Sequence, residues 1–113
     1  MIRIYHNPRC RKSRAGLEFV KLLNQPYEII DYLKNPLSEE DLTELISFLG
    51  IKPHDLLRKQ EAFYKDELKG KNISQKEMIE IMTANPTLIK RPIVVVNKKA
   101  VWADPPENIL NII

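Results

Sequence analysis

The single thiol of this chain, Cys10, is surrounded in the sequence by cations. Four basic residues lie within four positions of it: Arg9, Arg11, Lys12 and Arg14. The sequence predicts a helix directly after the cysteine, and the unsatisfied N–H groups at a helix start stabilise a thiolate. Helix starts and nearby cations lower a cysteine pKa to about 3.5–7.5. We therefore expect Cys10 to be a reactive thiol and not an inert, buried one.

One cysteine also limits the chemistry. It excludes an internal disulfide framework, a Cys-rich zinc site and an internal Cys-x-x-Cys couple, and we expect no metal site. The sequence has Ser13 where a Cys-x-x-Cys motif has its second sulfur. Any thiol chemistry must therefore take its second sulfur from another molecule. The same surroundings suit an oxyanion, because helix starts bind phosphate-like groups and arginine offers paired donors.

The hydrophobic pattern predicts the elements that position this site. We expect strands over residues 2–5, 27–32, 93–96 and 100–102. We expect helices over residues 12–24 and 51–59. Another helix begins after its N-cap Ser38 and ends at Gly50, and a further one begins at the capping box of Ser74 and Glu77 and ends at Asn85. The last helix follows its N-cap, Asp104. This order predicts one α/β domain over 1–113, with a four-stranded mixed sheet, flanking helices and a central helical insert at about 38–89.

The overall charge is modest, with 18 basic and 15 acidic residues and a formal net charge of +3. Neither terminus carries a dense basic run, so we expect no nucleic-acid partner. The longest purely apolar run, Ile93–Val96, is far shorter than the roughly 20 residues of a membrane span, and the N-terminus lacks a signal-peptide pattern. A free thiol fits a reducing compartment, so a cytoplasmic protein without membrane contact is expected.

Several stretches resemble the thioredoxin-fold arsenate reductases that work with glutathione and glutaredoxin. The matching stretches are Tyr5-His6-Asn7-Pro8-Arg9-Cys10, Ser13-Arg14, Leu56-Leu57-Arg58-Lys59, Asn85-Pro86 and Arg91-Pro92-Ile93-Val94-Val95. The resemblance extends over the whole chain, including the strand order and the helical insert. It implies a thioredoxin-like fold.

The resemblance also implies a reaction. Cys10 would be the thiolate that attacks arsenic and expels water. Glutathione would then attack as a co-substrate, and glutaredoxin would complete the reduction to arsenite, with no bound cofactor. Arg58 and Arg91 match two of the family's three oxyanion-binding arginines, and planar guanidinium groups suit a tetrahedral anion.

Four further positions match the family as supporting residues. Pro92 matches a cis-proline beside the active site, and His6 matches a histidine that helps to tune the cysteine. Ser13 could hydrogen-bond the thiolate or an anion. Ser13 and Arg14 both belong to the matched cysteine motif.

One position departs from the family pattern. The third arginine precedes the final helix, and here that position is Asp104. A carboxylate repels a doubly charged oxyanion. Two alternatives to the arsenate reductase remain open, and Asp104 favours the first of them. The first is a glutathione-linked monothiol redox protein without arsenate activity. The second is an Spx-like transcriptional regulator that binds RNA polymerase, although such proteins usually carry Cys-x-x-Cys.

Overall fold

The computed structural model describes residues 1–113, which form two compact units. The first unit combines Met1–Asn35 with Arg91–Ile113. The second unit is Pro36–Lys90, and the insert expected at about 38–89 lies within it. No helix has both the length and the apolar character needed to span a membrane.

The first unit is built on a four-stranded mixed sheet with the strand order β2-β1-β3-β4. The strands are β1 (Ile2–Tyr5), β2 (Tyr27–Ile30), β3 (Ile93–Val96) and β4 (Lys99–Trp102). Strand β1 pairs in parallel with β2 and antiparallel with β3, and β3 pairs antiparallel with β4. The predicted mixed sheet is therefore confirmed, and β2 ends two residues earlier than expected.

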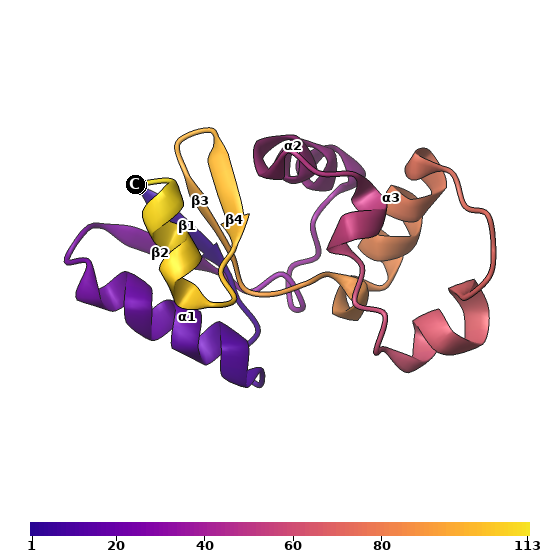
Figure 1. Cartoon of the computed structure of the whole chain (residues 1–113), viewed down its shortest axis with the longest axis horizontal. Coiled ribbons are helices and arrows are strands. Elements are labelled where there is room, and N and C mark those ends of the chain that lie inside the picture. Colours follow the sequence, from indigo (N-terminus) through magenta and orange to yellow (C-terminus); the bar gives the residue numbers. More distant parts are fainter. The chain divides into compact units, whose positions relative to one another are not determined.

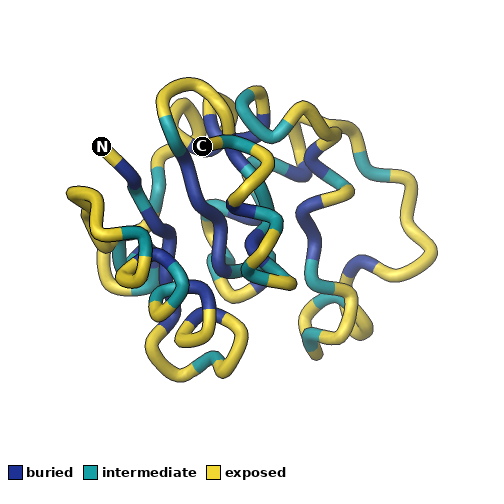
Figure 2. Tube along the Cα trace, turned by 60° about the vertical axis from the view of Figure 1, so that its left-hand side comes forward, coloured by how far each residue is buried: buried dark blue, intermediate teal, exposed yellow.

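Strand alternation creates the core of this unit. Ile2 and Ile4 point to one face of β1, and Val94 lies opposite Ile4 on β3. The helices α1 (Arg11–Leu22) and η4 (Pro106–Asn111) cover that face, where Val20 and Ile109 join the buried cluster (Figure 1). Figure 2 shows the buried stretches of the chain in dark blue, with exposed segments around them. This packing fixes the start of α1 against the sheet.

The second unit consists of helices and a short β-bridge. Its helices are α2 (Glu39–Leu49), the 3-10 helix η1 (Pro53–Leu56), the π-helix η2 (Tyr64–Leu68), α3 (Gln75–Ala84) and the 3-10 helix η3 (Pro86–Leu88). Ser38 Oγ accepts the Asp41 N–H at 3.0 Å, and Ser74 Oγ accepts the Glu77 N–H at 3.2 Å. Both predicted N-caps are confirmed. Gly50 ends α2 with a φ of 67°, in the left-handed region that glycine favours.

The helix expected over 51–59 is wrong in its extent. Only Pro53–Leu56 is helical, and Leu57 forms an isolated antiparallel bridge with Ile89. The Arg58 N–H donates to Leu88 O at 2.7 Å, and the Lys90 N–H donates to Leu56 O at 2.9 Å. These hydrogen bonds between two segments of the chain take the place of a further helical turn. Arg58 is therefore held on an extended segment.

Asp104 is not the N-cap of the final helix, contrary to the prediction. The 3-10 helix η4 begins at Pro106, and its N-cap is Pro105. Asp104 lies one residue too early to cap, and its carboxylate instead lies 2.9 Å from Lys12 Nζ. An ion pair with a residue distant in sequence has replaced the expected local interaction.

Candidate active site around Cys10

A hydrogen-bonded loop holds Cys10 at the start of α1. The Cys10 N–H donates to Asn7 O at 3.0 Å, and the Asn7 N–H donates to Ser13 Oγ at 3.3 Å. Ser13 is fully buried in the first turn of the helix. Arg14 Nη1 donates to Pro8 O at 3.1 Å, so its guanidinium supports the loop. Ser13 and Arg14 thus tie the loop before Cys10 to the helix after it.

The surroundings of Cys10 favour the thiolate. Cys10 is the N-cap of α1 and has extended backbone angles, with φ −93° and ψ 126°. Burial alone raises the pKa of its thiol, but the Ser13 N–H, the Arg91 guanidinium and the Lys12 N–H bind the thiolate. Together they hold the pKa below its ordinary value. Partial exposure of Cys10 leaves this nucleophile accessible.

Arg91 reaches Cys10 from the turn before β3. The Arg91–Pro92 peptide bond is cis. Trp102 Nε1 donates to Arg91 O at 3.2 Å, and the Ala103 N–H donates to Pro92 O at 2.9 Å. The turn before β3 is therefore anchored to the end of β4, and this anchoring orients the cation that lies beside the thiolate.

Helix α1 approaches the same turn very closely. A Cβ atom added to Gly16 would lie 2.6 Å from Pro92 Cγ, a separation that requires one group to shift. Only a residue without a side chain fits here. Gly16 therefore sets how closely α1, with Cys10 at its start, packs against Pro92.

His6 lies at the end of β1 and is buried, with 6% of its surface exposed. Burial lowers the pKa of its imidazole, and the attraction of Asp31 offsets only part of that effect. His6 is therefore neutral at neutral pH and adds no positive charge beside Cys10. Its backbone N–H donates to Ile30 O at 2.9 Å, which continues the β1–β2 pairing up to the loop.

Arg58 belongs to the second unit, whereas the other predicted site residues belong to the first. Its side chain is 14% exposed, and its Nη2 lies 3.4 Å from Glu61 Oε2. The backbone bond to Leu88 fixes the segment that carries it. The backbone of Arg58 is therefore fixed, and its guanidinium is paired with the Glu61 carboxylate.

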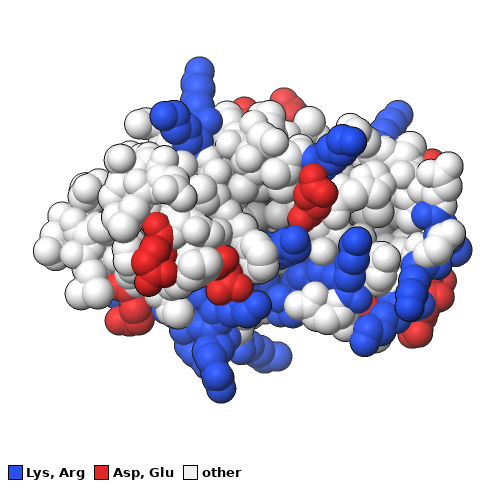
Figure 3. All heavy atoms as spheres, viewed as in Figure 1, with Lys and Arg blue, Asp and Glu red and all other residues white.

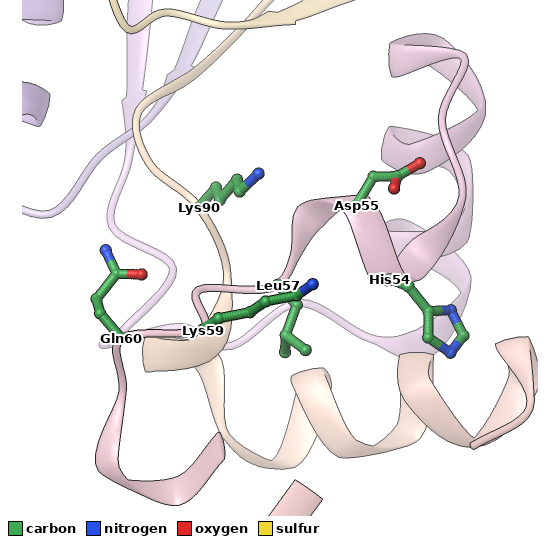
Figure 4. A pocket seen from close by; sticks show the side chains of 6 residues that line it. All are labelled: His54, Asp55, Leu57, Lys59, Gln60 and Lys90. Carbon is green, nitrogen blue, oxygen red and sulfur yellow. The ribbon is translucent and has the colours of Figure 1, made fainter. Parts of the chain in front are cut away.

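The second unit also contains an open pocket of about 350 Å³. Leu57 forms part of its wall, and Lys59 and Lys90 extend in the same direction from two different segments (Figure 4). His54, Asp55 and Gln60 complete the lining. No cysteine lines this pocket, and none of its lining residues belongs to the loop before Cys10.

Sequence reasoning missed a cluster formed by Lys12, Trp102 and Asp104. Lys12 Nζ lies 2.9 Å from Asp104 Oδ2 and 5.6 Å from the centre of the Trp102 ring. Figure 3 shows basic side chains gathered at the lower edge of the view, where α1 begins in Figure 1. The sequence signal for this cluster is weak, because its members lie at opposite ends of the chain.

The fold and the cysteine site define a thioredoxin-like thiol protein, and the comparisons confirm that fold. The model of the ArsC family matches residues 5–112, so the chain belongs to the ArsC family. Two solved structures cover 99% of this chain. They are a putative arsenate reductase from Yersinia pestis, with 39% identity, 100% of that chain covered and a TM-score of 0.92, and an arsenate reductase from Vibrio cholerae, with 36% identity, 97% covered and a TM-score of 0.94.

Two sequence relatives carry different descriptions. The uncharacterised protein YfgD of Escherichia coli K12 is 40% identical over 114 residues, which cover 99% of this chain and 96% of YfgD. An arsenate reductase of Acidiphilium multivorum is 37% identical over 113 residues, which cover 99% of this chain and 80% of that protein. The similarity therefore extends over essentially the whole of this chain.

Proposed function

We propose that this protein is an arsenate reductase-like thiol oxidoreductase in which Cys10 attacks arsenate. The observation that carries the proposal is the position of Cys10 at the N-cap of α1, where the Arg91 guanidinium and two backbone N–H groups surround its sulfur. Membership of the ArsC family and relatives named arsenate reductases support the same activity.

The first step forms a bond between Cys10 Sγ and arsenic and breaks the bond from arsenic to one hydroxyl oxygen. That hydroxyl takes up a proton from solvent and leaves as water. The Arg91 guanidinium stabilises the negative charge on the remaining oxygens, together with the N–H groups at the helix start. Arg58 is the second guanidinium of this proposal, supported by its fixed backbone and low exposure.

The electrons come from external thiols. Reducing arsenate to arsenite takes two electrons, so two thiols become one disulfide and one oxygen leaves as water. The chain has one cysteine, so it cannot form that disulfide internally. We assign the two thiols to glutathione and glutaredoxin and place the reaction in the cytoplasm, where glutathione keeps thiols reduced.

The test is an assay of arsenite formation from arsenate by the purified protein. We expect sustained turnover when glutathione and glutaredoxin are both present, and little turnover when either is omitted. Equal turnover with thioredoxin in their place would contradict the assigned reductant. No arsenite in any combination would contradict arsenate as the substrate.

Asp104 favours a second candidate, a monothiol protein that forms a mixed disulfide with glutathione and leaves arsenate unchanged. Its carboxylate lies beside the first turn of α1, paired with Lys12. For this candidate we expect a glutathione adduct on Cys10 when glutathione disulfide is added, and no arsenite in the assay above. Mass spectrometry of the intact protein detects that adduct.

A further inference from the structure

The side chain and the backbone of Lys12 point to different partners. Its backbone N–H binds the Cys10 thiolate. Its ammonium group lies 2.9 Å from Asp104 Oδ2 and 5.6 Å from the centre of the Trp102 ring. The ammonium is thus held by an ion pair and a cation–π contact on the side of Asp104 and Trp102.

We infer that Asp104 is a specificity-determining residue of the Cys10 site, because it holds the Lys12 ammonium away from a bound oxyanion and so favours singly charged over doubly charged tetrahedral anions. The inference rests on the proposed function in one respect, namely that an oxyanion binds at Cys10.

The charges of the cluster explain this effect. The Lys12 and Asp104 charges largely cancel at 2.9 Å, so Arg91 and the helix N–H groups supply the positive charge that acts on the anion. A second negative charge on the anion then adds little to the strength of binding. Lysine carries its ammonium on a flexible four-carbon stem, so removing the carboxylate frees it to turn toward an anion at the helix start.

Trp102 helps to hold the Lys12 side chain in place. Its indole N–H donates to Arg91 O at 3.2 Å, while Lys12 lies over its ring. The same side chain therefore contacts two of the three residues that bind the Cys10 thiolate, Arg91 and Lys12. This contact supports a held position for Lys12 in preference to a freely moving one.

The test measures how well inorganic anions protect Cys10 from alkylation by iodoacetamide. Sulfate is the doubly charged probe and perchlorate the singly charged one, at constant ionic strength and pH. We expect Asp104→Asn to tighten sulfate binding about two- to fivefold, the range of partly exposed ion pairs, and to change perchlorate binding less. Asp104→Ser provides a second variant without the carboxylate.

A double-mutant cycle with Lys12→Met separates the mechanism from simple repulsion. We expect the gain from Asp104→Asn to shrink when Lys12 is absent, because the freed ammonium causes part of it. Strictly additive effects would overturn the inference, since the carboxylate would then act on the anion directly. An unchanged sulfate affinity in both Asp104 variants would also overturn it.

A matched control is available on the same helix. Glu18 pairs with Lys21 at 3.5 Å, and Glu18→Gln removes one exposed carboxylate from α1. We expect this variant to leave sulfate protection unchanged. The readout needs no arsenate turnover, so a failed arsenate assay and a failed Asp104 inference are distinguishable.

Discussion

Groups from two ends of the chain lower the pKa of Cys10. The N–H groups of Lys12 and Ser13 come from the same helix start, whereas the Arg91 guanidinium comes from the turn before β3. Burial works against the thiolate, so its stability depends on these partners. At the scale of single residues, Arg91 is the cation on which the proposed chemistry depends most.

Replacing Arg91 by alanine should raise the pKa of Cys10, because the thiolate loses a charged hydrogen-bond donor. Alkylation depends on the thiolate, so the midpoint of the rate against pH should move upward. Arg91→Lys should restore part of the shift. Arg9→Ala, at an exposed position of the loop, is the control and should leave the midpoint in place.

The same interactions have a consequence for stability. The folded pKa of Cys10 lies below its ordinary value of 9.0, so the thiolate favours the folded state. This contribution is complete above the pKa of the unfolded thiol and is lost as the pH falls through the folded pKa. The Arg91→Ala protein should therefore show a smaller contribution from Cys10 in alkaline solution.

The sequence predicted that the pKa of Cys10 is lowered, but its local pattern did not indicate which cation lies beside the thiolate. Arg9, Arg11, Lys12 and Arg14 are close in sequence, yet Arg14 bonds to Pro8 O and Lys12 pairs with Asp104. Arg91 was predicted as an oxyanion ligand through the family resemblance, and its contact with the thiolate required the fold. Closeness in sequence does not determine where a long, flexible side chain ends.

At the scale of elements, the position of α1 against the Arg91–Pro92 turn governs the site. Gly16 permits that close approach, because a Cβ atom there would lie 2.6 Å from Pro92 Cγ. Ile4 and Val20 belong to one buried cluster, and its close packing holds α1 against the sheet.

We therefore expect Gly16→Ala to lower the free energy of unfolding by about 1–3 kcal/mol, the usual cost of overpacking. Alanine has a higher helix propensity than glycine, so without the contact to Pro92 this substitution would raise the free energy of unfolding. A decrease therefore indicates the close contact. Glu18→Ala, at an exposed position of α1, is the matched control and should have little effect. Urea unfolding measures both, and a more stable Gly16→Ala protein would contradict the close packing.

Elements with local signals were predictable and those with distant partners were not. Ser38 and Ser74 cap helices within their own first turns, so their sequence patterns sufficed. Asp104 has the composition of an N-cap but pairs with Lys12. The segment after Leu56 leaves the helix because it bonds to Leu88 and Ile89, which no local pattern indicated.

At the scale of the whole molecule, the predicted site residues are divided between the two units. Cys10 and Arg91 belong to the first unit, and Arg58 belongs to the second. The mixed sheet lies in the first unit, and the match to the ArsC family covers residues of both units. The proposed role of Arg58 is the part of the account that requires the second unit.

Arg58→Ala should raise the KM for arsenate about 10- to 100-fold, because hydrogen bonds to charged groups contribute about 1.5–3 kcal/mol. Lys59→Ala, at the exposed neighbouring position, is the control and should change KM by less than about twofold. Steady-state kinetics with arsenate as the varied substrate measures both. An unchanged KM in Arg58→Ala would remove Arg58 from the proposed oxyanion site.

The central claim is that the Cys10 thiolate reduces arsenate with the help of external thiols. The most direct measurement is the rate of arsenite formation by the wild-type protein and by Cys10→Ser, with glutathione and glutaredoxin present. We predict sustained turnover by the wild type and none above background by Cys10→Ser, which has no thiol left. Equal turnover by the two proteins, or none by the wild type, would contradict it.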